Sequence, residues 1–182
     1  MRVISGKYRG TKLFSPDGTA TRPTTDRIKE TLFNIINFDI NECTFLDLFS
    51  GTGQIGIEAM SRGAKSVTFV EEDNNAIKIL EKNIEKIRLQ NACKTYKMNI
   101  NKALPKISAE QQTYDIIFLD PPYYYTGIGD IVKYIIDNNI LLQTGKIIIE
   151  NATDADDIDD ERLILIKQKL YKNTKINIYE RM

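Results

Sequence analysis

The sequence predicts an α/β fold in which a mostly parallel sheet has helices on both faces and ends in an antiparallel hairpin. Two observations support this. From Thr44 onward, short apolar runs alternate with amphipathic helical stretches, which is the pattern of repeated β-α units. Near the end of the chain, residues 163–170 and 174–180 are extended runs joined by three residues with no helix between them. Such a hairpin makes its two strands antiparallel.

The positions of the elements follow the apolar pattern. Strands are predicted at residues 44–48, 66–71, 93–97, 115–119 and 146–150, and all of them except 93–97 are apolar runs. Apolar residues at helical spacing predict helices at residues 55–61, 74–89, 101–107 and 128–137. The acidic stretch 154–161 is expected to be a solvated loop. The chain has no internal repeat and no linker long enough to divide it.

The first part of the chain differs from the rest. Residues 2–5 and 12–14 flank two glycines and predict a short hairpin. A helix is expected to begin shortly after Pro23, with Ile28 and Leu32 on its apolar face. We therefore expect one domain of 182 residues, with an N-terminal extension of residues 1–37 on a core of residues 38–182.

Composition excludes several classes of protein. The 25 basic and 25 acidic residues cancel, but residues 1–30 carry seven basic side chains against three acidic ones, a local footprint suited to a polyanion. The absence of histidine excludes Ser-His-Asp and Cys-His catalysis and most metal sites. Cys43 and Cys93 form no CxxC pattern, so no disulfide framework or zinc site is expected. The chain shows no signal core or membrane-spanning run, so we expect a soluble cytoplasmic protein without a metal.

A glycine motif follows the first strand. Residues 47–56 contain G-x-G-x-x-G, in which Gly51 and Gly53 permit a tight turn close to a ligand and Gly56 permits the helix to pack on the sheet. The next strand ends in Glu71, which can accept hydrogen bonds from ribose hydroxyls. The motif therefore predicts an adenosine-type cofactor. Asp47 stands where dinucleotide folds usually keep an apolar residue, and its charge suits the cationic methionine end of S-adenosylmethionine.

A second motif, Asp120-Pro121-Pro122-Tyr123, follows the fourth strand. Two prolines fix the backbone and remove two donors, so a carboxylate and carbonyls project from a rigid turn. Asp120 and the Pro121 carbonyl could each accept one N–H of a planar exocyclic amine, and Tyr123 offers a face for stacking a base. Holding both hydrogens favours a pyramidal nitrogen that can attack a methyl group. The two motifs together indicate an S-adenosylmethionine-dependent methyltransferase that acts on a nucleobase amine.

These residues resemble the RsmD-type bacterial 16S rRNA guanine-N2 methyltransferases. The resemblance extends to about Tyr125 and rests on residues 2–10, 21–30, 47–53 and 120–123. It implies a Rossmann-like class I methyltransferase fold with seven strands, S-adenosylmethionine as cofactor, and methylation of one guanine N2 in 16S rRNA of the small ribosomal subunit or its precursor. It also implies that Asn99 lies near the adenine. The oligomeric state is open, and a monomer is the simpler expectation.

The predicted site residues fall into three groups. The catalytic turn comprises Asp120, Pro121, Pro122 and Tyr123. The cofactor-binding residues are Asp47, Phe49, Ser50, Gly51, Thr52, Gly53, Glu71 and Asn99. The residues predicted to hold RNA phosphates are Arg2, Lys7, Arg9, Arg22, Arg27 and Lys29.

Three alternatives remain open at this stage. One is an amino-methyltransferase with another acceptor, such as adenine N6, cytosine N4 or a protein glutamine. A second is a nicotinamide dehydrogenase, which should lack the Asp-Pro-Pro-Tyr motif. A third is a non-catalytic RNA-binding or assembly factor on the same fold, against which the intact Asp120 and glycine motif argue.

Overall fold

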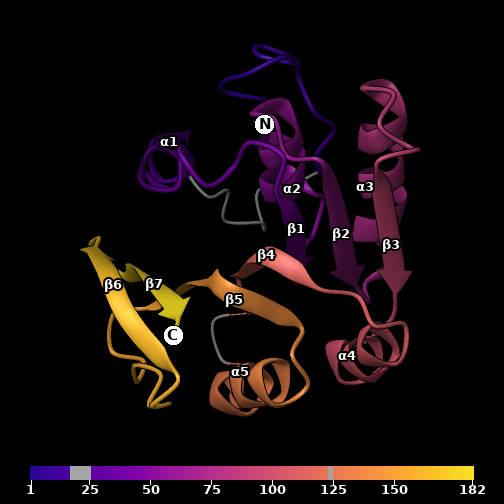
Figure 1. Cartoon of the computed structure of the whole chain (residues 1–182). Coiled ribbons are helices and arrows are strands. Elements are labelled where there is room, and N and C mark those ends of the chain that lie inside the picture. The colour runs from indigo at the N-terminus through magenta and orange to yellow at the C-terminus, as the bar shows by residue number, and fades with distance from the viewer. Residues whose placement is uncertain (17–25, 123–124) are drawn as a thin grey trace.

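The structure, a computed structural model, describes residues 1–16, 26–122 and 125–182. Its centre is a seven-stranded sheet with the order β3-β2-β1-β4-β5-β7-β6 (Figure 1). The strands are β1 (Thr44–Leu48), β2 (Ser66–Glu71), β3 (Cys93–Lys97), β4 (Tyr114–Leu119), β5 (Leu141–Ala152), β6 (Leu163–Leu170) and β7 (Thr174–Arg181). Strands β1 to β5 pair in parallel, whereas β7 is antiparallel to both β5 and β6. The predicted fold class is confirmed.

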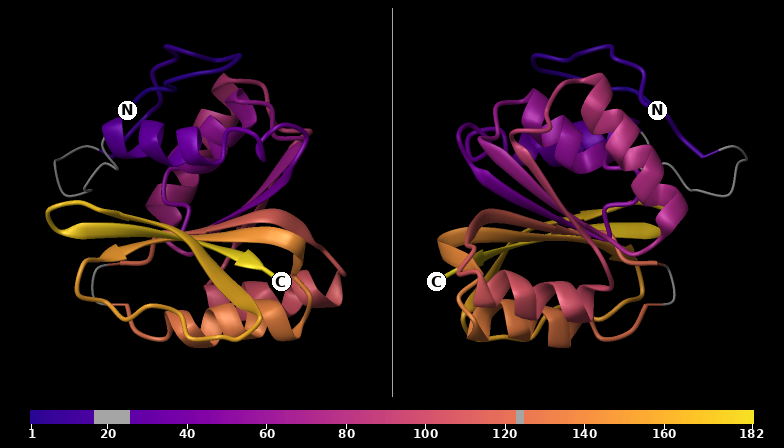
Figure 2. Two further views of the ribbon diagram at one scale, coloured as in Figure 1. Left: turned by 60° about the vertical axis from the view of Figure 1, so that its left-hand side comes forward. Right: turned by 90° about the vertical axis from the view of Figure 1, so that its right-hand side faces the viewer.

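Helices cover both faces of this sheet. They are α1 (Asp26–Ile35), α2 (Gln54–Ser61), α3 (Asn74–Lys86), α4 (Ile100–Ala109) and α5 (Ile128–Asp137). Figures 1 and 2 show α1, α2 and α3 on one face and α4 and α5 on the other. The buried apolar residues accordingly form two clusters, one with each set of helices.

The central strands show why the sequence adopts this arrangement. In β1, Phe45 packs in the cluster under α1 to α3, and the next residue, Leu46, packs in the cluster over α4 and α5. Successive side chains of a strand point to opposite faces, so a strand covered on both faces must be apolar at nearly every position. Burying each such side chain contributes about 1.5–3 kcal/mol.

Three elements differ most in extent from the prediction. Strand β5 begins at Leu141 rather than at residue 146, because Leu141 pairs with Tyr114 across an irregular register although the next three residues are exposed. Helix α3 ends at Lys86, three residues early, and Arg88 has a positive φ of 58°. The predicted N-terminal hairpin consists of a single antiparallel bridge between Arg2 and Lys12.

Among the residues that the structure describes, every helix is too short or too polar to cross a membrane.

Candidate functional site

The loop between β1 and α2 carries the glycine motif and has an unusual backbone. Phe49, Gly51 and Gly53 have φ angles of 60°, 53° and 81°, a left-handed region that side chains disfavour. The N–H of Gly53 donates to the Ser50 carbonyl at 2.8 Å, and the N–H of Ser50 donates to the Val70 carbonyl at 3.0 Å. The chain thus turns sharply from the carboxyl end of β1 into α2, as the glycine spacing predicts.

Glu71, the last residue of β2, holds this loop through its carboxylate. Its Oε2 accepts the Gly51 N–H at 2.7 Å, and its Oε1 accepts the N–H groups of Glu72 at 2.9 Å and Asp73 at 2.8 Å. These three bonds fix the carboxylate, and Oε2 keeps one lone pair for a further donor. Glu71 is therefore well placed for the predicted ribose hydroxyls, and that role stays a prediction.

Asp47 is a buried carboxyl below the same loop. Its Oδ2 accepts the N–H of Gly56 at 2.9 Å. Burial raises the pKa of Asp47 to about 8, and the charges of Asp120 and Glu71 add to the rise, whereas the hydrogen bond from Gly56 opposes it. A nearby cation would favour the ionised form of such a carboxyl. The cationic methionine end that the sequence predicts for this position would have this effect on Asp47, and that role stays a prediction.

Helix α3 supports the loop in a way that the sequence did not predict. Asn83 is fully buried, and its Nδ2 donates to the Thr52 carbonyl at 3.0 Å. On the same face, Leu80 fills the space beside Gly53, where an added Cβ would lie 2.3 Å from its Cδ1. Its spacing from Leu80 and Ile87 places it on the apolar side of the helix, and this is the local signal for its burial, although a polar residue on an amphipathic helix is ordinarily expected to face solvent.

The space around Gly56 and Gly51 indicates whether this loop can accommodate S-adenosylmethionine. A Cβ on Gly56 would lie 2.3 Å from Phe69 Cε1, so Gly56 serves the packing of α2 on the sheet, as predicted. A Cβ on Gly51 would meet nothing within 4 Å, so the backbone there borders open space. Open backbone beside the acceptor of Glu71 and the carboxyl of Asp47 fits an adenosine carrying a cationic methionine end.

The Asp-Pro-Pro turn begins beside the glycine loop. Strands β1 and β4 are neighbours, and their last residues, Leu48 and Leu119, are partners in the register. The two motifs therefore leave the sheet at the same edge and at the same level. Asp120 is exposed there, and its negative charge contributes to the raised pKa of Asp47.

The turn folds back onto the glycine loop. The Pro122 carbonyl accepts the Tyr125 N–H at 2.8 Å. The Tyr125 ring meets the Phe49 ring edge-on, with 4.9 Å between the centroids. The segment that follows the Asp-Pro-Pro turn is thus in contact with the glycine loop through these two rings. Tyr123, predicted to stack on the base, lies outside the described residues.

Asn99 lies where β3 leads into α4. Its Oδ1 accepts the Asn101 N–H at 2.9 Å and caps the helix, and its Nδ2 donates to Glu72 Oε2 at 2.9 Å. The side chain therefore joins the ends of β2 and β3, and its predicted place near the adenine stays a prediction.

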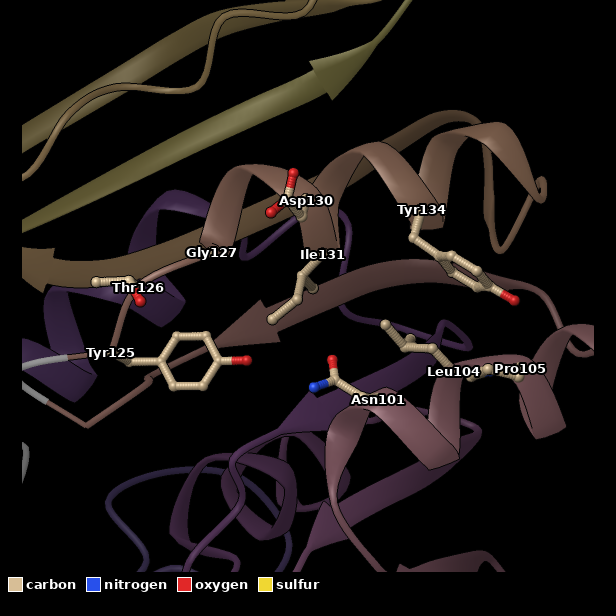
Figure 3. A pocket seen from close by; sticks show the side chains of 9 residues that line it. All are labelled: Asn101, Leu104, Pro105, Tyr125, Thr126, Gly127, Asp130, Ile131 and Tyr134. Atoms are coloured by element: carbon tan, nitrogen blue, oxygen red, sulfur yellow. The ribbon is translucent and has the colours of Figure 1, made fainter.

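A pocket of about 320 Å³ lies between α4, α5 and the segment after the Asp-Pro-Pro turn (Figure 3). In Figure 3 the Tyr125 hydroxyl points into the space between Asn101 and Ile131. The walls combine apolar and aromatic side chains with polar groups from Asn101, Thr126 and Asp130. The lining residues are Asn101, Leu104, Pro105, Tyr125, Thr126, Gly127, Asp130, Ile131 and Tyr134.

The basic residues predicted to hold RNA divide into three cases. Arg2, Lys7, Arg9 and Arg27 are exposed, as a phosphate contact requires. Within this group, Arg2 Nε lies 3.0 Å from Asp26 Oδ2, and Lys7 Nζ lies 5.5 Å from the centre of the Tyr8 ring. Arg22 lies outside the described residues. Lys29 is the third case.

The prediction for Lys29 is wrong. Its side chain is fully buried, its Nζ donates to the Arg2 carbonyl at 2.7 Å, and Glu58 Oε2 lies 3.7 Å away. Burial lowers the pKa of Lys29, and the charge of Glu58 opposes that shift. A count of charges along the chain does not separate such a residue from its exposed neighbours. Lys29 holds the N-terminus in place instead of contacting RNA.

Glu58 and Ser61 of α2 hold the N-terminal segment, residues 1–16, and the sequence did not predict either role. The carboxylate of Glu58 accepts the N–H groups of Ile4 at 2.8 Å and Ser5 at 3.0 Å. The Ser61 hydroxyl accepts the Tyr8 N–H at 2.9 Å. The segment that bears Arg2, Lys7 and Arg9 is therefore docked on the helix that begins at the glycine loop.

The sheet order and the loop after its first strand are those of the class I methyltransferases, whose methyl donor is S-adenosylmethionine. A family model described as "Conserved hypothetical protein 95" matches residues 1–180. Ribosomal RNA small subunit methyltransferase D of Haemophilus influenzae is 33% identical, with 99% of this chain and 93% of that protein covered. The protein of the same name from Escherichia coli is 33% identical, with 85% and 76% covered.

The fold comparison agrees. A solved structure of the Escherichia coli protein yhhF has a TM-score of 0.88 and 30% identity, and the alignment covers 100% of this chain and 97% of that one. The chain belongs to the family of the ribosomal RNA small subunit methyltransferase D proteins. The resemblance read from the sequence is confirmed.

Proposed function

We propose that this protein transfers a methyl group from S-adenosylmethionine to the exocyclic N2 amine of a guanine in 16S rRNA of the small ribosomal subunit. The observation that carries the proposal is the pairing of Leu48 with Leu119, because it starts the cofactor loop and the Asp-Pro-Pro turn side by side. An amine held by Asp120 is thereby brought to the edge where the cofactor loop begins. Positioning of this kind supplies much of the catalysis when the methyl donor is already activated.

The chemistry assigns a role to each part of the turn. S-adenosylmethionine, when bound, supplies a methyl group made electrophilic by the sulfonium. The guanine amine is a poor nucleophile because its lone pair is delocalised into the ring. Asp120 accepts one amine N–H and the Pro121 carbonyl accepts the other, which favours attack and opposes the positive charge that grows on nitrogen. The proton that leaves afterwards passes to Asp120 or to solvent.

RNA as the substrate is supported by the N-terminal segment and by the names of the relatives. Arg2, Lys7, Arg9 and Arg27 are exposed on a protein whose net charge is zero. Contacts with phosphates position an RNA, whereas contacts with the base itself, here at the Asp-Pro-Pro turn, select the base. The base has to leave its stack to reach Asp120. Relatives aligned over 99% and 85% of this chain are named as small subunit rRNA methyltransferases.

The test is methyl transfer from labelled S-adenosylmethionine to small ribosomal subunits from cells that lack this protein, followed by nucleoside analysis. We expect label in N2-methylguanosine, and none with the Asp120→Ala variant. Label in another nucleoside would keep the methyltransferase and overturn the guanine assignment. Cofactor binding without label on any RNA would favour the non-catalytic alternative.

A further inference from the structure

Asn83 is buried between the N-terminal segment and the loop that joins β1 to α2, which we call the cofactor loop. Its Oδ1 accepts the Phe14 N–H at 2.7 Å, and its Nδ2 donates to the Phe14 carbonyl at 3.2 Å. The same Nδ2 donates to the Thr52 carbonyl of the cofactor loop at 3.0 Å. One amide group therefore joins the N-terminal segment to the cofactor loop.

This junction differs from the other attachments of the segment. Glu58 and Ser61 bind the segment to the body of α2, with contacts at Ile4, Ser5 and Tyr8. Asn83 holds the far end of the segment from α3, and its third hydrogen bond goes to the loop itself. Figure 1 shows the indigo N-terminal segment on the face of the sheet that carries α2 and α3.

The geometry makes the two halves of the junction interdependent. The pair of bonds to Phe14 fixes the plane of the amide, and that plane decides where the second hydrogen of Nδ2 points. A shift of Thr52 or of Phe14 would leave a buried polar group without its partner, which is costly in a fully buried side chain. Ordering of one part therefore favours order in the other.

We infer that Asn83 is a positioning residue that couples the cofactor loop to the N-terminal segment, so that cofactor and RNA strengthen each other's binding. The RNA half of this inference rests on the proposed function. The coupling is reciprocal, because a ligand that raises the affinity of a second one has its own affinity raised by the same factor.

The first test compares RNA affinity with and without S-adenosylhomocysteine, the product, so that no turnover occurs. Small subunits from cells lacking the protein serve as the RNA. We expect S-adenosylhomocysteine to tighten binding of the wild type about five-fold or more, and the Asn83→Ala variant to bring that ratio close to one. A ratio near one in the wild type, or an unchanged ratio in a folded Asn83→Ala variant, would overturn the coupling.

Ser61→Ala is the matched control. It loosens the same N-terminal segment at the Tyr8 N–H but leaves the contact of Asn83 with the loop intact. It should weaken RNA binding in the presence and absence of S-adenosylhomocysteine alike and keep the ratio of the wild type. Loss of the ratio in Ser61→Ala as well would assign the effect to general loosening of the segment and would contradict a specific role of Asn83.

A second measurement needs neither a variant nor RNA. Hydrogen exchange of the wild type should show slower exchange of the Phe14 amide when S-adenosylhomocysteine binds, because that amide donates to Asn83. Unchanged exchange at Phe14 with the cofactor product bound would overturn the inference. If exchange at Phe14 slows but no RNA accepts a methyl group, the coupling holds and the proposed function fails.

Discussion

The backbone amide of Gly51 donates to the carboxylate of Glu71 at 2.7 Å, so a residue at the end of β2 holds the loop at the end of β1. The two residues are 20 positions apart, and the parallel pairing of β1 with β2 brings them together. The sequence motif links these residues through the ligand that both would contact. The structure shows that they also contact each other, so Glu71 helps to fix the shape of the loop.

Glu71→Gln should weaken cofactor binding strongly. The carboxylate accepts N–H groups from Gly51, Glu72 and Asp73, whereas a glutamine side chain has one oxygen and would direct an NH₂ group at a backbone donor. We expect an increase of about ten-fold or more in the Kd of S-adenosylhomocysteine by calorimetry. Glu81→Gln, on an exposed ion pair with Lys97, is the control and should bind normally. Equal affinities in the two variants would contradict the role of Glu71.

Asp120→Asn should separate chemistry from binding. The amide keeps the shape of the side chain but loses the charge that opposes the positive nitrogen, so the methyl-transfer rate should fall by roughly 10²–10³. S-adenosylhomocysteine should still bind nearly as tightly, because the loop between β1 and α2 is held by Asp47 and Glu71. Asp154→Asn in the exposed acidic loop is the control. A rate equal to that of the control would remove Asp120 from the mechanism.

Alanine at two glycines of the same motif should have different effects. Gly56→Ala places a Cβ 2.3 Å from Phe69 Cε1, so we expect an unfolding free energy lower by about 1–3 kcal/mol. Gly51→Ala meets no atom within 4 Å and costs about 1 kcal/mol for its φ of 53°. It should nevertheless bind the cofactor less well, since its methyl group enters the ligand's space. Normal cofactor affinity in Gly51→Ala would place the cofactor elsewhere.

Asp47 should make the stability of the cofactor-free protein depend on pH. Its pKa of about 8 in the folded protein exceeds the ordinary value of about 4, so the folded state keeps a proton that the unfolded chain releases. The stabilisation from the protonated form is complete below about pH 4 and is lost as the pH rises through about 8. Urea melts should therefore show the wild type losing stability relative to Asp47→Asn over this window. A constant difference between them would refute the raised pKa.

Lys29 and Arg27 should respond oppositely in two assays. Lys29→Met removes the donor to the Arg2 carbonyl and leaves Arg62 as the cation beside Glu58, so it should lower the unfolding free energy by about 1–3 kcal/mol. Its RNA affinity should keep the salt dependence of the wild type. Arg27→Ala, on the exposed side of α1, should leave stability nearly unchanged and flatten the dependence of RNA affinity on salt. A flatter salt dependence in Lys29→Met would show that Lys29 does meet phosphate.

Much of the fold could be predicted from the sequence. The bounds of β1 and β2 agree with the prediction, because strands buried on both faces stand out as apolar runs between polar turns. The bounds of the edge strand β3 agree as well, although only Tyr96 of that strand is buried. The sequence also predicted that the glycine motif and the Asp-Pro-Pro-Tyr motif lie at one edge of the sheet, since parallel strands end at the same edge. The start of β5 did not follow, because residues 142–144 are exposed and only the pairing of Leu141 with Tyr114 makes that stretch a strand.

The sequence by itself determined the α/β class and the family, and it predicted the cofactor loop and the amine-holding turn, because each depends on residue types at short, fixed spacings. Only the tertiary structure decided that Lys29 is buried and that Glu58 and Asn83 hold the N-terminal segment. Their partners lie far away along the chain: Glu58 meets residues 53 and 54 positions away, and Asn83 meets Phe14 across 69 positions. Helical periodicity shows which face of a helix is apolar. Which polar side chain is buried on that face depends on the backbone groups that another segment brings to it, and local pattern does not record those groups.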